Sequence, residues 1–255
     1  DGRTAEELLR NADMALYRAK SDGGGVHHFF EKEMDRHAQR RRDMEIDLRH
    51  ALANGEFELH YQPLVDLDQD RIVSFEALLR WRHPEKGMIS PADFIPLSED
   101  IGLIVPLGEW VLREACKQAV AWPSEVRVAV NLSAAQFRSR NLSQAVFTAL
   151  ALSGLSPRRL ELEITESIFL ADSEANLAIL HQLREFGVRI SMDDFGTGYS
   201  SLSYLRSFPF DKIKIDRAFI DGLATNVQSE AIVRSTLILA HSLNIPVLAE
   251  GVETK

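Results

Sequence analysis

Two adjacent carboxylates, Asp193 and Asp194, follow a short apolar run that begins at Val188. Because like charges repel, neighbouring carboxylates need a cation, hydrogen bonds or solvent to offset that repulsion. A hard divalent cation is one such partner, since it prefers oxygen ligands. Gly196 and Gly198 follow, and a backbone without Cβ atoms can turn sharply or approach a phosphate closely. Taken alone, the stretch fits a cation site and an ordinary strand-to-helix turn with solvated acids equally well.

Other polar side chains stand within or directly after apolar runs: Glu76, Asn131, Glu163, Lys214 and Glu250. In a parallel α/β barrel, such positions converge at the carboxyl ends of the strands. Carboxylates with one amide carbonyl form a hard-oxygen set that suits Mg²⁺ or Mn²⁺, and their number favours two ions. The absence of clustered His and Cys argues against zinc. Paired divalent ions are a standard device for phosphodiester hydrolysis.

Each of these residues also has a structural interpretation. Glu76 could pair with Arg80, which points to the same side of a strand. Glu161 or Glu163 could form an ion pair with Lys214, and an asparagine can cap a turn. A polar group near the same end of nearly every strand is nevertheless hard to explain by chance, so the set favours one shared site.

The elements that must position these residues follow from hydrophobic periodicity. Strands are predicted over residues 57–62, 72–79, 126–131, 160–165, 188–192, 212–215 and 247–249, and helices over 105–122, 142–153, 174–186, 199–208 and 229–243. The first two strands could pair antiparallel. The alternation predicts an α/β fold with a parallel sheet, and seven strands suit a (β/α)8 TIM-like barrel that stops before its last unit. A doubly wound open sheet is the alternative, disfavoured because no dinucleotide fingerprint follows the early strands.

The N-terminal residues do not continue the alternation of strands and helices. Thr4 and Glu7 form a capping box for a helix, and residues 26–30 predict a short strand. One helix and one strand cannot bury a core alone, so residues 1–31 are predicted to be the remnant of a preceding domain. Residues 32–54 predict a helical linker, and residues 55–255 form the main domain.

Composition narrows the function classes. Of 255 residues, 29 are Lys or Arg and 38 are Asp or Glu, which leaves a net charge of −9. This balance argues against a partner that is a polymeric nucleic acid. The single cysteine, Cys116, fits a reducing compartment, and no apolar run is long enough to span a bilayer. We therefore expect a cytoplasmic segment, whose parent protein could be anchored in a membrane elsewhere.

The run Phe75-Glu76-Ala77-Leu78-Leu79-Arg80-Trp81 resembles the signature that names the EAL family of cyclic di-GMP phosphodiesterases. Six further stretches resemble the family's motifs in the right order: Gln62-Pro63, Asn131-Leu132-Ser133, Glu163-Ile164-Thr165-Glu166, the run from Asp193 to Ser201, Lys214-Ile215-Asp216, and Glu250-Gly251-Val252-Glu253. The resemblance extends from residue 56 to the end of the chain. Residues 1–31 resemble the final helix and strand of a GGDEF diguanylate cyclase domain, which would make that domain a partner in the parent protein.

The resemblance implies a barrel whose first strand is antiparallel. It implies a cyclic-guanylate-specific phosphodiesterase that needs Mg²⁺ or Mn²⁺ and converts cyclic di-GMP to linear pGpG, in bacterial signalling of biofilm formation and motility. By this resemblance the metal ligands are Glu76, Asn131, Glu163, Asp193, Asp194 and Glu250. Catalysis would involve Glu76, Asp193 and Lys214. Lys214 would act on the attacking water as a base or, more in keeping with nearby metals, as an electrostatic stabiliser.

The same resemblance assigns nucleotide contacts to Gln62, Arg80, Pro91 and Asp216. The resemblance also implies that Glu166 braces a loop that helps to form a homodimer. That loop contains Phe195, Gly196, Thr197 and Gly198. One departure is that a family member continues beyond Glu253 through another helix and strand, so the last β/α unit is missing from this chain. The alternative function is a silent EAL domain that only binds cyclic di-GMP. An unrelated metal-dependent barrel enzyme is a third reading. Because the signature Glu, the Asp pair and the Lys are all present, the active enzyme is favoured.

Overall fold

The computed structural model describes residues 4–21, 25–169, 173–196, 208–223 and 225–252. The chain divides into two compact units. The first contains Asp1–Glu56 and Trp81–Ile101, and the second contains Phe57–Arg80 and Gly102–Lys255. Strand β2 passes from the second unit into the first.

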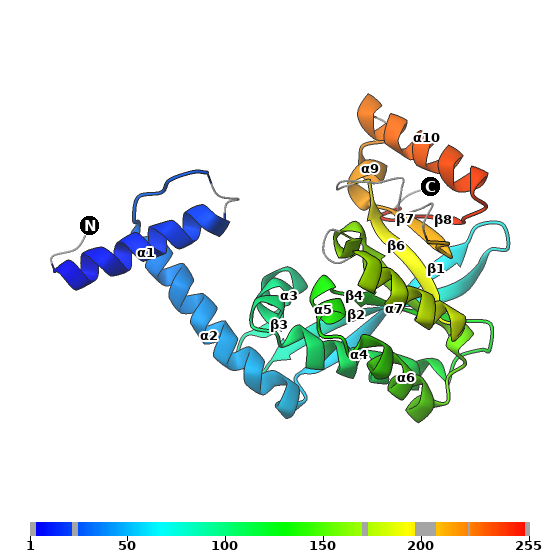
Figure 1. The fold of residues 1–255 in the computed structure, drawn as a ribbon, viewed down its shortest axis with the longest axis horizontal. Helices are drawn as coiled ribbons and strands as arrows, with labels where there is room; N and C mark the ends of the chain where they lie inside the picture. The colour runs from blue at the N-terminus through cyan, green and yellow to red at the C-terminus, as the bar shows by residue number, and fades with distance from the viewer. Residues whose placement is uncertain (1–3, 22–24, 170–172, 197–207, 224, 253–255) are drawn as a thin grey trace. The chain divides into compact units, whose positions relative to one another are not determined.

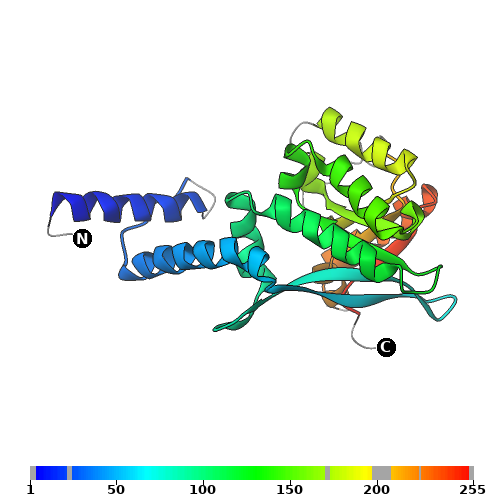
Figure 2. The same ribbon diagram turned by 90° about the horizontal axis from the view of Figure 1, so that it is seen from below.

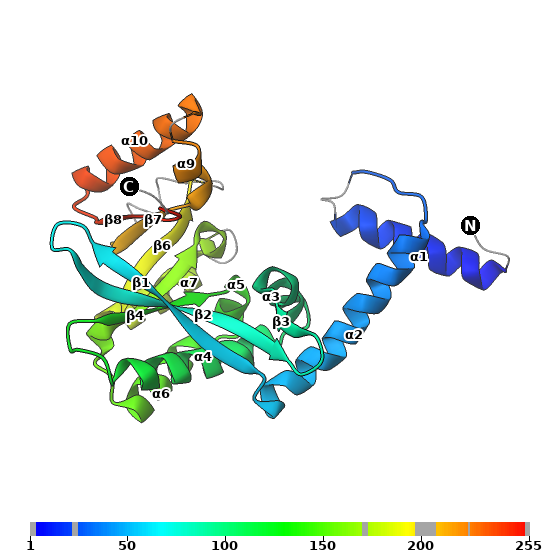
Figure 3. The same cartoon turned by 180° about the vertical axis from the view of Figure 1, so that it is seen from behind.

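A curled sheet forms the centre of the second unit (Figure 1). Its strands, in spatial order, are β1 (Phe57–Asp66), β2 (Arg71–His83), β4 (Arg127–Leu132), β5 (Leu160–Thr165), β6 (Arg189–Phe195), β7 (Lys212–Ile215) and β8 (Val247–Ala249). Each neighbouring pair from β2 to β8 is parallel. β1 and β2 form a hairpin across a short turn and so run in opposite directions (Figure 3). The predicted α/β, TIM-barrel-like fold with an antiparallel first strand is confirmed.

Helices cover the outer face of this sheet. They are α4 (Ile104–Ala119), α5 (Ala134–Arg138), α6 (Leu142–Ser153), α7 (Ser173–Glu185), α9 (Arg217–Asp221) and α10 (Val227–Ser242), with short 3-10 turns at Pro157–Arg159 and Glu166–Phe169. Helices α4, α6 and α7, green to yellow-green in Figure 2, lie side by side. Strand residues that face them are apolar and fully buried, among them Val128, Leu160, Leu162, Ile190 and Ile213.

On β5 and β7 the alternate residues face inward and are charged. Strand β5 carries Glu161 and Glu163, and β7 carries Lys212 and Lys214, all four of them buried. Side chains alternate between the two faces of a strand, so an apolar outer face and a charged inner face come from one period-2 pattern. This sheet therefore directs its charged groups into its own interior.

The first unit consists of α1 (Ala5–Ser21), α2 (Lys32–Asn54), β3 (Gly87–Ile89), α3 (Pro91–Asp100) and the end of β2. Thr4 caps α1, since its Oγ1 accepts a hydrogen bond of 3.2 Å from the Glu7 backbone N–H. Asp47 of α2 pairs with His83 at 3.2 Å. The indole of Trp81 donates a hydrogen bond of 3.0 Å to Glu56. These bonds tie α2 to the end of β2.

Most predicted elements are confirmed, and those over residues 142–153, 160–165, 212–215 and 247–249 match in both bounds. The bounds of the other described elements differ from the prediction by one to four residues at an end, and three further details differ. Residues 26–30 form no strand, and β3 was missed because three residues carry too little periodicity. The strand predicted to end at Met192 continues to Phe195, so both adjacent aspartates lie inside β6. The helix predicted over residues 199–208 lies almost entirely outside the described residues.

Candidate active site

The ammonium group of Lys214 lies among four carboxylates at the carboxyl ends of the strands. Its Nζ is 2.6 Å from Glu163, 2.7 Å from Glu250, 3.2 Å from Asp193 and 3.3 Å from Glu76. These residues come from β5, the end of β8, β6 and β2 respectively. We call the four acids the carboxylate ring. Glu163 and Lys214 are each only 1% exposed, so their charges interact with little screening by water.

Two further predicted ligands adjoin this ring. The Asn131 side-chain amide donates a hydrogen bond of 2.7 Å to Glu76 Oε1, which leaves the amide oxygen able to bind another group. Asp194 has a φ of 52°, and the pairing of β6 with β7 is irregular between Met192 and Phe195. Such a bulge re-aims side chains at a strand end. As a result, carboxylate oxygens of Asp193, Asp194 and Glu250 lie within 4.8 Å of one another.

Burial and charge shift the pKa values at this site. Burial raises the pKa of Glu163 to about 8, with Glu76 and Asp193 adding to the rise against the opposing effect of Lys214. Burial also raises the pKa of Asp194 to about 6, helped by Asp193 and other acids. For Lys214, burial alone would lower the pKa, but the surrounding carboxylates outweigh it and raise the pKa above its ordinary value. Lys214 therefore keeps its proton, and the carboxylates carry more negative charge than it can neutralise.

These residues fit a divalent cation. Of the described residues around Lys214, five are carboxylates, and one ammonium group offsets only one of their charges. Among the described residues, the buried Glu163 Oε1 has no hydrogen-bond partner. A buried carboxylate oxygen without a partner is unfavourable unless a cation or another donor meets it. The donor set is all oxygen, as Mg²⁺ and Mn²⁺ require.

The observed contacts test the purely structural roles considered for Glu76, Glu163 and Asn131. Glu76 contacts Asn131 and Lys214, whereas the hydrogen bond found for Arg80 goes to the Leu79 carbonyl. The predicted Glu163–Lys214 ion pair does form, but within the larger ring. The cap of the next helix is Ser133, not Asn131.

The residues predicted to brace a loop are partly described. A Glu166 carboxylate oxygen accepts a hydrogen bond of 3.2 Å from the Gly196 backbone N–H. Gly196 has a φ of +95°, where a Cβ would also lie 3.3 Å from the Phe219 ring. Phe195 is buried, and Thr197 and Gly198 lie outside the described residues. The contact between Glu166 and the start of this loop is thus present.

The predicted nucleotide contacts fall in both units. Gln62 is exposed on β1, and Arg80 lies on β2, four residues beyond Glu76 toward its carboxyl end. Asp216 follows β7 and caps α9, accepting a hydrogen bond of 2.8 Å from the Ala218 backbone N–H. Pro91 begins α3 in the first unit. The structure brings Asp216 close to Asp194, whose pKa it helps to raise.

One supporting residue was missed by sequence reasoning. Gly251 directly follows Glu250 and has a φ of +72°. A Cβ on Gly251 would lie 2.4 Å from the Arg217 side chain, so only glycine allows this approach. The Glu-Gly pair was a visible signal in the sequence, but the contact with Arg217 depends on the fold.

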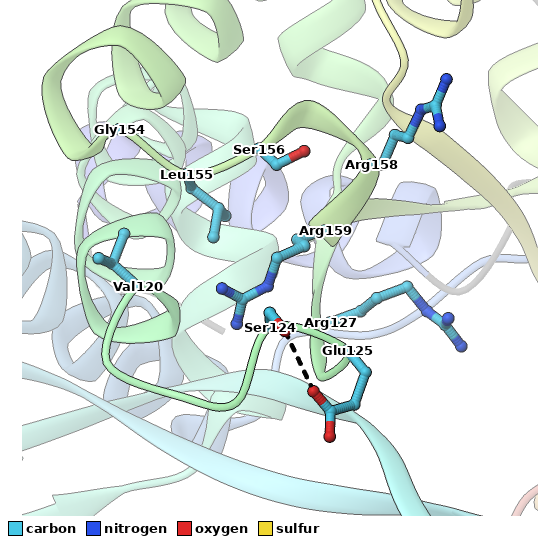
Figure 4. Close-up of a pocket in the computed structure, with 9 residues that line it drawn as sticks. All are labelled: Val120, Ser124, Glu125, Arg127, Gly154, Leu155, Ser156, Arg158 and Arg159. Carbon is cyan, nitrogen blue, oxygen red and sulfur yellow. Dashed lines mark hydrogen bonds between the residues drawn. The ribbon is translucent and has the colours of Figure 1, made fainter.

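A cavity of about 450 Å³ opens at the other ends of the strands (Figure 4). Residues at or just before the starts of β4 and β5 line it, including Arg127, Arg158 and Arg159. Figure 4 shows these three guanidinium groups pointing in different directions. Arg159 donates to the Val126 and Ala119 carbonyls at 2.9 and 2.7 Å. The cavity is therefore separate from the carboxylate ring and shows no convergent anion site.

None of the helices in the described part of the chain combines the length and the apolar character that crossing a membrane requires.

Comparison with known proteins places this geometry in a family. Residues 45–255 match the EAL domain. An uncharacterized signaling protein of Caulobacter vibrioides is 54% identical over 255 residues, which is 100% of this chain and 32% of that protein. The bifunctional diguanylate cyclase/cyclic di-GMP phosphodiesterase MucR of Pseudomonas aeruginosa is 48% identical over 100% of this chain and 38% of its own length. The chain thus spans about a third of the length of these curated relatives.

A solved structure of the PaMucR phosphodiesterase in complex with c-di-GMP superposes with a TM-score of 0.80 at 48% identity, covering 84% of this chain and 88% of that one. The family match covers most of the chain and includes every strand of the curled sheet. On the sequence match, the superposition and the ring of acids around Lys214, the chain belongs to the EAL domain family.

Proposed function

We propose that this domain hydrolyses cyclic di-GMP to linear pGpG with the help of Mg²⁺ or Mn²⁺. The observation that carries the proposal is the ring of four carboxylates within 3.3 Å of the buried Lys214 ammonium. Relatives named as cyclic di-GMP phosphodiesterases support the choice of substrate. So does the c-di-GMP complex of the similar MucR structure.

The ligands of two ions would be Glu76, Asn131, Glu163, Asp193, Asp194 and Glu250. Bound there, the ions would supply a hydroxide nucleophile at neutral pH and offset the charge of the phosphodiester. Before metal binds, the surrounding carboxylates raise the pKa of Lys214 above its ordinary value, which favours a role in holding the attacking oxygen by charge and hydrogen bonding over the removal of its proton. Arg80 would bind a phosphate of the substrate through its planar guanidinium. Other contacts to the nucleotide would come from Gln62, Asp216 and Pro91.

We also propose that Glu166 braces the loop that begins at Phe195 and that this loop contributes to a homodimer. The hydrogen bond from Gly196 to Glu166 supports the brace. Residues 1–31 are proposed to belong to a GGDEF domain of the parent protein. Support comes from MucR, which is named as both a cyclase and a phosphodiesterase and of which this chain spans 38%.

The test is to incubate the purified chain with cyclic di-GMP and either Mg²⁺ or Mn²⁺ and to resolve pGpG by chromatography. We expect metal-dependent hydrolysis that Glu76→Ala abolishes while the circular dichroism spectrum is unchanged. Glu125→Ala is the matched control, because this exposed acid lies in the loop before β4. Nucleotide binding without hydrolysis in the wild-type chain would favour the silent receptor instead.

A further inference from the structure

A second group of charged side chains lies beneath the carboxylate ring. Glu161 and Lys212 stand two residues before Glu163 and Lys214 on the same strands, and so face the same way. They form an ion pair, and Glu161 is 0% exposed. With a rise of about 3.3 Å per residue, this pair lies roughly 7 Å below the ring. The proposed chemistry uses neither residue.

Three arginines and one aspartate complete this group, which we call the lower layer: Arg127, Glu161, Arg184, Arg189, Asp211 and Lys212. Glu161 Oε2 is 3.9 Å from Arg127 Nε and 3.7 Å from Arg189 Nε. Asp211 lies 3.7 Å from Arg189 Nη2 and 3.7 Å from Arg184 Nε. The lower layer therefore holds four cations and two carboxylates, the opposite balance to the ring above it.

The contacts between Glu161 Oε2 and the arginines are Coulombic. Separations of 3.7 and 3.9 Å are too long for hydrogen bonds. Among the described residues, Glu161 Oε2 and both arginine Nε atoms are buried without a hydrogen-bond partner. The side chains of Arg127 and Arg189 are 27% and 32% exposed, whereas Glu161 is fully buried and Lys212 nearly so. Water therefore screens the Glu161 and Lys212 charges least, and their potential reaches the ring.

We infer that Glu161 and Lys212 set the affinity of the carboxylate ring for a divalent cation, acting as positioning residues through the potential beneath it. The inference rests on the proposed metal site. Removing the charge of Glu161 leaves four cations against one carboxylate in the lower layer, which repels a cation above it more strongly. Removing the charge of Lys212 leaves three cations against two carboxylates, so the lower layer repels that cation less than in the wild type. The two substitutions therefore have opposite effects.

The experiment titrates the chelator-treated full chain with Mn²⁺ alone and counts free Mn²⁺ by electron paramagnetic resonance. We expect Glu161→Gln to weaken Mn²⁺ binding at least about tenfold and Lys212→Met to tighten it by a similar factor, since one unit of charge changes at short range in each. The double variant Glu161→Gln/Lys212→Met should return to within about threefold of the wild-type Kd, because the two changes cancel. Glu125→Gln is the control and should leave the Kd unchanged.

Weaker binding in both single variants would mean a purely structural role and would overturn the inference, as would an unchanged Kd in both. Glu161→Gln leaves Lys212 buried without its partner, so folding is checked by circular dichroism. If that variant does not fold, Lys212→Met must still tighten binding and the double variant must still resemble the wild type. Hydrolysis is measured separately, so a chain that binds Mn²⁺ with these shifts but does not cleave cyclic di-GMP contradicts the proposed function and upholds the inference.

Discussion

Lys214 and Lys212 lie two residues apart on one strand, and both are buried beside a glutamate of β5, yet their surroundings differ in sign. Four carboxylates lie within 3.3 Å of Lys214. Lys212 pairs with Glu161, which two arginines also approach. In the lower layer, charges of opposite sign pair with one another and need no further ion. An excess of buried negative charge opposes folding, and its presence therefore points to a bound cation and to function.

The largest expected difference between the two lysines is in the stability lost when each is replaced by methionine. Without metal, Lys214→Met leaves the ring with no cation, and we expect a loss of about 3–5 kcal/mol in the free energy of unfolding. Lys212→Met should cost only about 1 kcal/mol, since Arg127 and Arg189 still neutralise Glu161. Urea unfolding in a chelating buffer measures both. Equal losses would show that the charge imbalance has no energetic consequence.

Gly251→Ala tests how strictly the ring depends on its backbone support. The new Cβ would lie 2.4 Å from the Arg217 side chain. The alanine would also have to adopt the φ of +72° that Gly251 has. We expect about 1 kcal/mol of backbone strain plus 1–2 kcal/mol from the clash, and at least about a tenfold loss of hydrolysis as Glu250 moves.

Gly154→Ala is the matched control for this substitution. Its φ is +73°, but no atom lies within 4 Å of the new Cβ. The control should show the strain alone and keep full activity. Similar activity losses in both variants would argue against a special role of the contact between Gly251 and Arg217.

The stability of the metal-free protein should fall as pH rises through the range in which Asp194 ionises. Burial, with Asp193, Asp216 and Glu250, raises the pKa of Asp194 from 3.8 to about 6. A raised folded-state pKa favours the folded state below pH 3.8, and this contribution disappears as pH passes about 6. Asp194 is partly exposed, so screening limits the effect to about 1 kcal/mol. Asp194→Asn should remove the contribution of Asp194 and leave that of Glu163, whose pKa is raised to about 8, as chemical unfolding at pH 4 to 7 would show. An unchanged pH profile would place the effect elsewhere.

Replacing Glu166 has the smallest expected effect, because its carboxylate accepts a backbone hydrogen bond and takes no part in the ring around Lys214. Glu166→Ala removes the acceptor of the Gly196 N–H and should cost about 1 kcal/mol of local stability. Amide exchange at Gly196 should accelerate in Glu166→Ala and change less in Glu166→Gln, which keeps an acceptor oxygen. Faster exchange confined to the 3-10 turn at Glu166–Phe169 would contradict the brace and show that Glu166 stabilises only its own turn.

The sequence by itself determined the element order and the polar residues at the strand ends. Periodicity arises between residues a few positions apart, so the bounds of β5, β7, β8 and α6 could be predicted from local pattern alone. The order of the motifs indicated the family. The strand bulge at Asp194 escaped prediction, because an irregular register arises between two strands and leaves no mark in either one.

Only the tertiary structure decided which acids meet Lys214. Glu76 lies 138 positions away from Lys214 in the chain, and Glu163 lies 51 away, so their contacts depend on the curl and register of the whole sheet. The same holds for the lower layer, where Lys212 meets Glu161 across 51 positions. It holds equally for Gly251, whose need to lack a side chain is set by Arg217. A sequence shows which charges exist, but their distances and their burial from water are set by the tertiary structure, and both decide the Coulomb energy.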